Sequence, residues 1–183
     1  MLGKRHMNTT VHDFKERLAF SQSTRNEDFW LACYKVAFPD NVGCFPTVED
    51  SESQRKGIDR LIHMANGKTL YIDEKVREVY YPDILLEYVS SSTTLSPGWV
   101  EKPLLIDYLA YAFLPTRVVY LLPWLSLQRA WRENKSNWLE KYGKIRAHNQ
   151  TYDTLCCPVP TNILFSALNR AMRVVVPEEP EWE

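Results

Sequence analysis

The sequence predicts a mixed α/β (α+β) protein, and three observations support this prediction. Residues 57–75 have the pattern of two β-strands joined by a tight turn. Residues 26–38 show helical periodicity, and further strand-like and helix-like apolar runs follow the hairpin, separated by Pro, Gly and polar segments. The 183 residues, of which 45% are hydrophobic and 25% charged, suffice for one domain with a substantial core. We therefore expect residues 1–183 to form a single domain.

The N-terminal part is expected to form two helices and a short strand. Residues 12–20 have one apolar face and predict a short helix. Asn26 is a good N-cap for a second helix, and Glu27 lies in its first turn, where the helix dipole favours an acidic residue. Pro39 ends this helix, and residues 42–45 predict the first strand. The polar residues that follow, up to Lys56, are expected to be a surface loop, or a loop that faces DNA.

Residues 57–75 are expected to form a β-hairpin. An Asn-Gly pair at its centre, Asn66-Gly67, is a strong hairpin signal, because both central residues of a type I′ turn need a positive φ. We therefore predict that residues 57–64 and 68–75 are adjacent antiparallel strands. Both segments are rich in β-forming residues, namely Ile58, Leu61, Ile62, Leu70, Tyr71 and Ile72.

The rest of the chain predicts alternating strands and helices. Breakers and periodicity indicate strands at 84–89, 117–122 and 152–159, and helices at 100–114, at 125–142 and from Thr161 to Met172. Glu87 lies inside the first of these strands. A buried glutamate needs a cationic or metal partner, so we expect Glu87 to lie on the solvated face.

The predicted hairpin brings two carboxylates and an ammonium to one edge. Pairing about the turn places Asp59, at the start of the first strand, beside Asp73, at the end of the second. Lys75 points the same way as Asp73, because strand side chains repeat every two residues. These groups could form an ion pair at a solvated sheet end, worth about 0–1 kcal/mol. They could also bind Mg²⁺, which takes one or two carboxylates together with water and substrate phosphates.

The succession of Asp59 and, fourteen positions later, Asp73-Glu74-Lys75 resembles the PD-(D/E)xK nuclease superfamily. Members of this family have an aspartate on one strand and an (Asp/Glu)-x-Lys triplet on the next, and Gly57-Ile58-Asp59 is a common variant of the first half. The resemblance implies a restriction-endonuclease-like core, a helix-strand-hairpin-strand-helix-strand mixed sheet flanked by helices. This core would span residues 26–125, and residues 125–183 would add a C-terminal helical extension.

The resemblance also implies roles for individual residues. Asp59, Asp73 and the backbone carbonyl of Glu74 would bind Mg²⁺ or Mn²⁺. Lys75 would position the attacking water or stabilise charge on the phosphate. The family often adds a glutamate from the first helix, for which Glu27 is the best match. Asp73 stands where the family more often has glutamate, and its shorter side chain could shift the metal slightly.

DNA is the partner that the resemblance implies, and its phosphates require cations. The candidates are residues around the hairpin: Gln54, Arg55, Lys56, Arg60, Lys68 and Arg77. These residues could instead form a solvated rim. The net charge of −1 provides no overall basic field, so any DNA-binding surface must be a local patch.

Other features favour a cytoplasmic protein. The spacing of Cys33, Cys44, Cys156 and Cys157 fits neither a zinc site nor a disulfide framework, so we expect reduced thiols. The N-terminus lacks the apolar stretch of a signal peptide. The longest apolar region, 104–127, is interrupted by charged residues and prolines and does not predict a membrane span.

Three interpretations of function remain open at this point. The first is a Mg²⁺-dependent DNA endonuclease or exonuclease. The second is a nuclease-fold protein whose cleavage is weak or lost and which binds a nucleic acid, a protein partner or a second copy of itself. A compact chain with 13% aromatic residues is also typical of bacteriophage accessory proteins, which fits both. The third is an unrelated α/β protein in which the Asp59 and Asp73-Glu74-Lys75 pattern is a coincidence.

Overall fold

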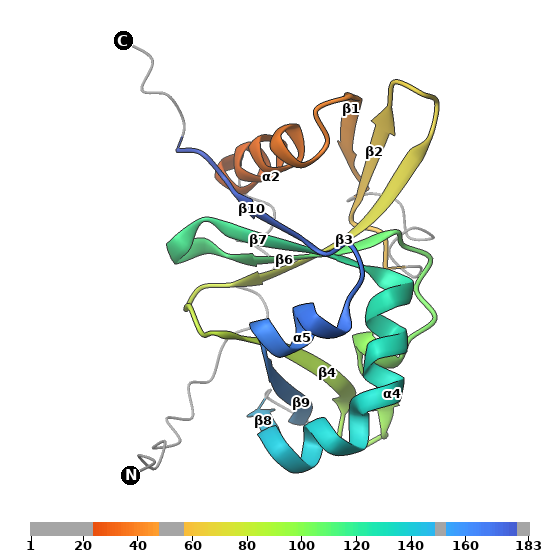
Figure 1. Cartoon of the computed structure of the whole chain (residues 1–183), viewed down its shortest axis with the longest axis vertical. Helices are drawn as coiled ribbons and strands as arrows, with labels where there is room; N and C mark the ends of the chain where they lie inside the picture. Colours follow the sequence, from red (N-terminus) through yellow and green to blue (C-terminus); the bar gives the residue numbers. More distant parts are fainter. Residues whose placement is uncertain (1–23, 48–56, 149–152, 179–183) are drawn as a thin grey trace.

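The computed structural model describes residues 24–47, 57–148 and 153–178 and has a mixed α/β architecture (Figure 1). A six-stranded sheet lies at its centre, with the strand order β1-β2-β3-β6-β7-β10. These strands are β1 (Asn41–Pro46), β2 (Arg60–Met64), β3 (Thr69–Arg77), β6 (Tyr108–Phe113), β7 (Val118–Pro123) and β10 (Met172–Val175). Only β3 and β6 are parallel, so the sheet is mixed.

The predicted hairpin is confirmed, but its turn differs from the expected type. Strands β2 and β3 pair antiparallel, with Arg60 opposite Ile72 and His63 opposite Thr69. Gly67 has a φ of 82°, whereas Asn66 has a negative φ, so the turn is not type I′. The N–H of Gly67 donates to the Met64 carbonyl, and the Asn66 side chain accepts from the N–H of Lys68. This pattern fits a three-residue loop in which only the glycine is left-handed.

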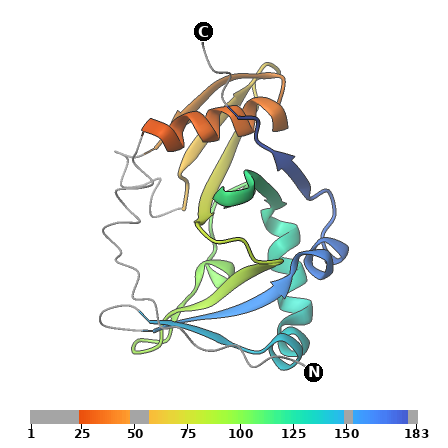
Figure 2. The same cartoon turned by 90° about the vertical axis from the view of Figure 1, so that its left-hand side faces the viewer.

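Helix α2 (Thr24–Ala37) covers one face of the central sheet (Figure 2). The predicted helix and the predicted first strand are therefore confirmed, with the helix beginning two residues before Asn26. Aromatic residues of α2 pack onto alternate residues of the strands, because side chains of one strand face point the same way every second residue. The resulting cluster includes Phe29, Trp30, Tyr34, Ile62, Leu70, Ile72, Ala110 and Ala112.

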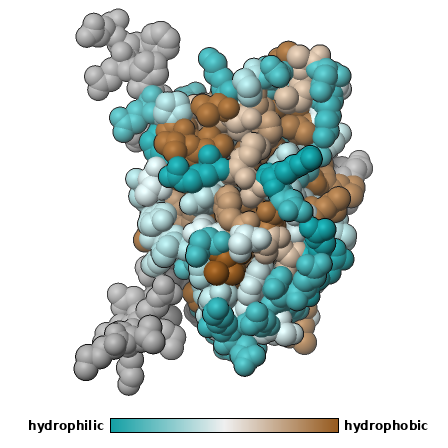
Figure 3. Space-filling model, in the orientation of Figure 1, coloured by the Kyte–Doolittle hydropathy of each residue, from teal (hydrophilic) through white to brown (hydrophobic). Residues whose placement is uncertain are grey.

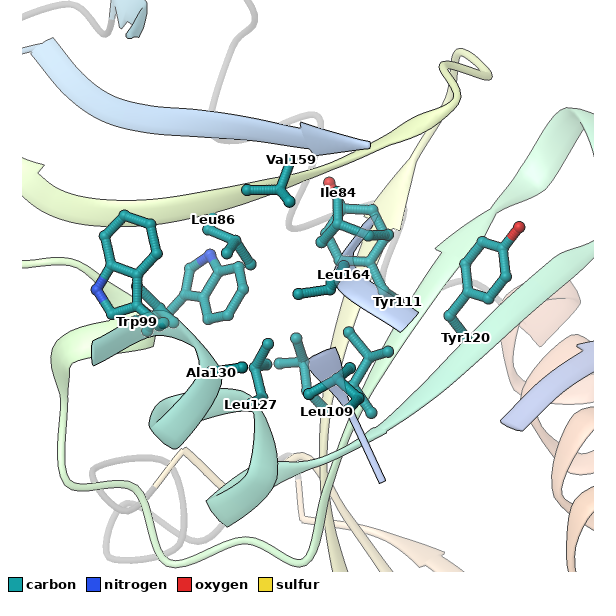
Figure 4. Packing of buried hydrophobic residues seen from close by; sticks show 14 of the residues in the cluster. Ile84, Leu86, Trp99, Leu109, Tyr111, Tyr120, Leu127, Ala130, Val159 and Leu164 are labelled. Atoms are coloured by element: carbon teal, nitrogen blue, oxygen red, sulfur yellow. The ribbon is translucent and has the colours of Figure 1, made fainter. Parts of the chain in front are cut away.

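A second sheet packs on the other face of the central sheet. Its strand order is β5-β4-β9-β8, and its strands are β5 (Ser96–Pro97), β4 (Asp83–Ser91), β9 (Asp153–Pro160) and β8 (Ile145–His148). Helices α4 (Trp124–Tyr142) and α5 (Thr161–Ala167) lie on the same side. Figure 4 shows side chains from both sheets and both helices meeting in one core, among them Leu86, Leu109, Tyr111, Leu127 and Leu164. Over α4 the surface is mostly hydrophilic (Figure 3).

The second core helix predicted at 100–114 is wrong. This segment contains a short 3₁₀ helix, η1 (Trp99–Glu101), followed by β6. Residues 109–113 are buried without interruption, because β6 is a central strand covered on both faces. A continuous apolar run of this kind has no periodicity that separates a buried strand from a buried helix. Residues 78–107, which join the parallel strands β3 and β6, contain β4, β5 and η1 and no α-helix; the strand predicted at 84–89 is confirmed as β4.

The C-terminal part is only partly helical. This finding corrects the expected C-terminal helical extension. The predicted helix at 125–142 is confirmed as α4, and the extended piece at 152–159 as β9. The last helix begins at Thr161 as predicted, but it ends at Ala167, and Met172 begins β10 on the edge of the central sheet. The helix predicted at 12–20 lies outside the described residues.

Two further observations concern the expected environment of the protein. All four cysteines are free thiols, as predicted. Among the described residues, no helix has the length and apolar character needed to span a membrane.

Candidate functional site

Asp59 and Asp73 meet on the face of the central sheet that points away from α2. Asp59 directly precedes β2, and its N–H donates to the Ile72 carbonyl at 2.8 Å, which extends the β2–β3 ladder by one residue. The Asp59 Oδ2 atom accepts a hydrogen bond from the N–H of Glu74 at 2.7 Å. Burial raises the pKa of Asp73, and the neighbouring Asp59 carboxyl group raises it as well. The structure thus brings together the two carboxylates that the sequence predicts to converge.

Lys75 completes this group from the same strand face. Its Nζ atom lies 2.5 Å from Oδ1 of Asp73. Asp73 is only 3% exposed, and its second oxygen, Oδ2, is buried without a hydrogen-bond partner among the described residues. A buried carboxylate oxygen without a partner is costly. A proton shared between Asp73 and Asp59, or a cation bound by both, would give this oxygen a partner.

The surroundings of Asp73 move its pKa from the acidic range of an ordinary aspartate toward neutral pH. The pKa of Asp73 is raised to about 7, mainly by burial; the charge of Lys75 lowers it, and the negative Asp59 raises it. Burial alone would lower the pKa of Lys75, but the charges of Asp73 and Asp59 outweigh this effect and raise it. Lys75 is therefore charged at neutral pH, while Asp73 titrates near neutrality. Perturbed pKa values of this kind are frequent at functional sites.

The chain that leads into Asp59 is fixed by close packing. Gly57 has a φ of 73°, and a Cβ atom there would lie 2.8 Å from the Leu104 side chain. Thr47 holds the same segment from the end of β1, because its N–H donates to the Asp59 carbonyl at 2.9 Å and its hydroxyl donates to the Ile58 carbonyl. The role of Thr47 was not predicted, since no local sequence signal links residues so far apart.

Arg60 and Glu74 point to the face of the sheet opposite to Asp59 and Asp73. Arg60 is 2% exposed, and its guanidinium donates to both oxygens of Glu27 and to Glu74 Oε1 at 2.6–2.9 Å. Tyr34 donates to the same Glu74 oxygen at 2.9 Å. Arg60 is thus not available as a phosphate contact, and Glu27 lies with Arg60 rather than with Asp59 and Asp73. The strand alternation explains both results, because residues 60 and 74 follow 59 and 73 by one.

The other predicted phosphate contacts are also distant or occupied. Arg77 pairs with Asp83 at 2.9 Å and lies over the Tyr81 ring, so its charge is already engaged. Lys68 is exposed but lies at the turn end of the hairpin, five residues from Asp73, or about 16 Å along a strand. Gln54, Arg55 and Lys56 lie outside the described residues.

Comparisons with protein-family models, with curated proteins and with solved structures found no match to this chain.

The side chains at this site offer only a small set of ligands for a divalent cation. Among the residues that the structure describes, no three or more His, Cys, Asp or Glu side chains are grouped as metal ligands. Asp59 and Asp73 nevertheless supply two hard oxygen donors in contact, and Asp73 Oδ2 has no other partner there. Mg²⁺ commonly uses one or two carboxylates and completes its shell with water and substrate phosphates. The pair therefore suits a weak, water-rich Mg²⁺ site, in which the Glu74 carbonyl remains a predicted ligand.

Glu87 is the acidic residue that the sequence places inside an apolar strand. Glu87 on β4 is half-buried, and it accepts a hydrogen bond from the N–H of Trp99 at 3.3 Å. Burial raises its pKa, while the Trp99 hydrogen bond and the charges of Lys102 and Lys75 oppose the rise. Glu87 thus lies on the less buried face of β4, where it is partly exposed. The signal was present, since a glutamate inside an apolar strand requires a partner, but the partners come from other parts of the chain.

Proposed function

We propose that this protein hydrolyses DNA phosphodiesters with Mg²⁺ or Mn²⁺, in the manner of a PD-(D/E)xK nuclease. The observation that carries the proposal is the contact between the Asp59 and Asp73 carboxyl groups, with Lys75 paired to Asp73 from the same strand. This is the grouping that the family pattern requires, and it occurs on one face of a β-hairpin. A coincidental pattern would not be expected to leave a buried carboxylate oxygen without a partner beside a second carboxylate.

The arrangement of elements gives further support to a restriction-endonuclease-like core. The order of α2, β1, β2 and β3 matches the helix, strand and hairpin that the family implies, and β6 returns parallel to β3 after a crossover. The crossover differs, because the expected second helix is absent and the strand predicted at 84–89, β4, belongs to the second sheet. In this proposal, the family core consists of α2, β1–β3 and β6, and the second sheet is an addition to it.

Each residue of the site would have its own role in the reaction. Asp59 and Asp73 would hold the metal ion, which lowers the pKa of bound water and offsets the negative charge of the phosphodiester. Lys75 keeps its positive charge at neutral pH because its pKa is raised, so it can hold an attacking water or a phosphate oxygen by a charged hydrogen bond. Asp73, whose pKa is raised to about 7 in the metal-free site, would give up its proton when the metal ion binds, because a carboxylate ligand must be deprotonated.

Cleavage of supercoiled plasmid tests this proposal. Asp73→Ala and Lys75→Ala should each reduce Mg²⁺-dependent nicking by at least about 100-fold, because each removes a charge that acts on the reacting phosphate. Lys35→Ala provides the control, since Lys35 is exposed on α2, on the far side of the sheet. Circular dichroism should show all three variants folded. If Asp73→Ala and Lys75→Ala nick like the parent, the proposed site is not where hydrolysis occurs.

A second candidate function is binding to a partner without cleavage. Leu125, Ser126, Arg129 and Arg132 line a shallow pocket on α4, which shares no residue with the Asp59–Asp73 site. Leu125 is an exposed apolar residue, and the two arginines beside it could receive an acidic partner surface. This alternative predicts that Arg129→Ala with Arg132→Ala abolishes biological activity, whereas Asp73→Ala leaves it unchanged.

A further inference from the structure

Two exposed aromatic side chains lie beside the Asp59–Asp73 site, on the same face of the central sheet. In the strand registers, Leu61 on β2 stands between Phe45 on β1 and Tyr71 on β3. Leu61 follows Asp59 by two residues, and Tyr71 precedes Asp73 by two. Side chains two residues apart on a strand point the same way, about 7 Å apart. The set of Phe45, Leu61 and Tyr71, here called the aromatic row, is thus continuous with the site.

The aromatic row is open to solvent at both of its rings. Phe45 is 52% exposed and Tyr71 is 39% exposed, whereas Leu70 and Ile72, which flank Tyr71 on its strand, are buried under α2. The second sheet lies at the other end of the molecule from the turn of the hairpin and does not cover this part of β1–β3 (Figure 1). Large apolar side chains that are exposed together on one face often mark a binding surface.

The backbone of Tyr71 and the ring of Phe45 are both held in place. The N–H of Tyr71 donates to Oδ2 of Asp107 at 3.0 Å, and its carbonyl accepts from the N–H of Asp107 at 2.7 Å. The Phe45 ring lies over Gly43, where a Cβ atom would come within 2.6 Å of it, and it meets the His63 ring edge-to-face with the ring centroids 5.4 Å apart. Groups that are fixed in advance lose little conformational freedom when a ligand binds.

The charges near the site favour a ligand that makes contacts beyond those of its phosphates. Arg60 and Arg77 are engaged in buried ion pairs, and Lys68 lies 3.9 Å from the Asp107 carboxylate. The net charge of the chain is −1. Non-specific binding of duplex DNA depends on phosphate contacts, and the faces of its bases are covered by neighbouring bases. An unpaired strand offers these faces to aromatic rings, and every base can stack in this way.

We propose that Phe45 and Tyr71 stack the bases of an unpaired DNA strand whose backbone lies at Asp59 and Asp73. The inference rests on the proposed function for the role of the two carboxylates. It adds that the substrate is single-stranded DNA, or DNA with a single-stranded portion. Because the aromatic row lies about 7 Å from the carboxylates, it receives the bases within about two steps of the phosphate at the site, at 3.4 Å a step.

Binding to a strand with and without bases tests this proposal without using cleavage. A fluorescein-labelled oligothymidine is compared with an abasic strand of the same length by fluorescence anisotropy, with Ca²⁺ in place of Mg²⁺. The abasic strand keeps every phosphate but lacks the base faces, so the parent should bind it more weakly, by at least about fivefold. Phe45→Leu combined with Tyr71→Leu should weaken oligothymidine binding to the abasic level. Binding of the abasic strand should be unchanged, which also shows that the variant is folded.

Two controls separate stacking from a general loss of aromatic surface. Tyr80→Leu removes another exposed ring, which follows the far end of β3, about 20 Å from Tyr71 along the strand. This variant should keep the preference of the parent for oligothymidine. Phe45→Tyr combined with Tyr71→Phe retains both rings and should keep the preference as well.

The outcomes separate this inference from the proposed function. The inference is overturned if the parent binds both strands equally or binds neither, if the double leucine variant keeps the preference, or if Tyr80→Leu loses it to the same extent. A dimeric parent that becomes monomeric in the double leucine variant would assign the aromatic row to a second copy of the chain and also overturn it. If the preference depends on the aromatic row but the parent cuts neither plasmid nor oligothymidine with Mg²⁺, the stacking stands and the proposed hydrolysis fails.

Discussion

Arg60 donates to Glu74 at 2.6 Å on the face of the central sheet opposite to the contact between Asp59 and Asp73. Each of these two buried residues directly follows a carboxylate of the candidate site along its strand. The ion pair therefore links β2 to β3 on one face of the sheet. The carboxyl groups of Asp59 and Asp73, one residue earlier on each strand, meet on the other face. Glu27 extends the tie to α2 through two further bonds with Arg60.

Removal of Arg60 should destabilise the fold strongly. Arg60→Met leaves Glu27 and Glu74 without their cation, and breaking a buried ion pair from one side costs about 3–5 kcal/mol. Urea unfolding followed by tryptophan fluorescence measures the free energy of unfolding. Arg132→Met is the matched control, because Arg132 is exposed on α4 and should change stability by less than about 0.5 kcal/mol.

A double variant checks whether the ion pair is the cause. Arg60→Met combined with Glu74→Met removes both charges, so it should lose less stability than Arg60→Met alone. If the double variant loses as much stability as Arg60→Met alone, or as much as the two single variants added together, the cost comes from packing around residue 60 rather than from an unpaired carboxylate.

Stability should also depend on pH through Asp73. Its pKa is raised to about 7 in the folded protein, whereas an unfolded aspartate titrates at about 3.9. Between these values the folded state binds more protons, so its stability falls as pH rises, by up to about 1 kcal/mol per pH unit. Asp73→Asn should flatten this dependence. The measurement is urea unfolding from pH 4.5 to 7.5 in EDTA, and an unchanged slope in Asp73→Asn would contradict it.

Two glycines with a positive φ provide a matched test of the packing before Asp59. Gly67→Ala adds a Cβ atom in open space, so only the left-handed backbone is strained, at a cost of about 1–2 kcal/mol. Gly57→Ala has a similar backbone cost and also places its Cβ atom against Leu104. Thermal unfolding should therefore show a larger loss for Gly57→Ala, and Leu104→Ala in the same chain should reduce the difference. Equal losses for the two single variants would exclude a tight contact at Leu104.

The hairpin and its charged edge could be predicted because their signals are local. The Asn66-Gly67 pair set the turn, and the alternation of strand side chains placed Asp73 and Lys75 on one face. The same rule placed Arg60 and Glu74 on the other face. The ion pair of Arg60 could not be predicted, because the sequence does not show that α2 covers that face with Glu27 in reach of the guanidinium.

The parts that could not be predicted depend on contacts between distant segments. The apolar run at 109–113 has no periodicity, so only its pairing with β3 and β7 identifies it as a strand. Glu87 is near Lys75 only because the crossover forms a second sheet instead of a helix.

The most direct test of the central claim is a paired assay of Asp59→Asn, with plasmid nicking in Mg²⁺ and DNA binding in EDTA, without divalent ions. Asn keeps the shape of Asp59 and its acceptor for the Glu74 N–H, but it removes the charge that would hold the metal ion. We predict that nicking is lost, while DNA affinity in the absence of divalent ions is unchanged or slightly tighter, because a negative charge near the phosphates is gone. Nicking by Asp59→Asn at the rate of the parent protein would contradict the account.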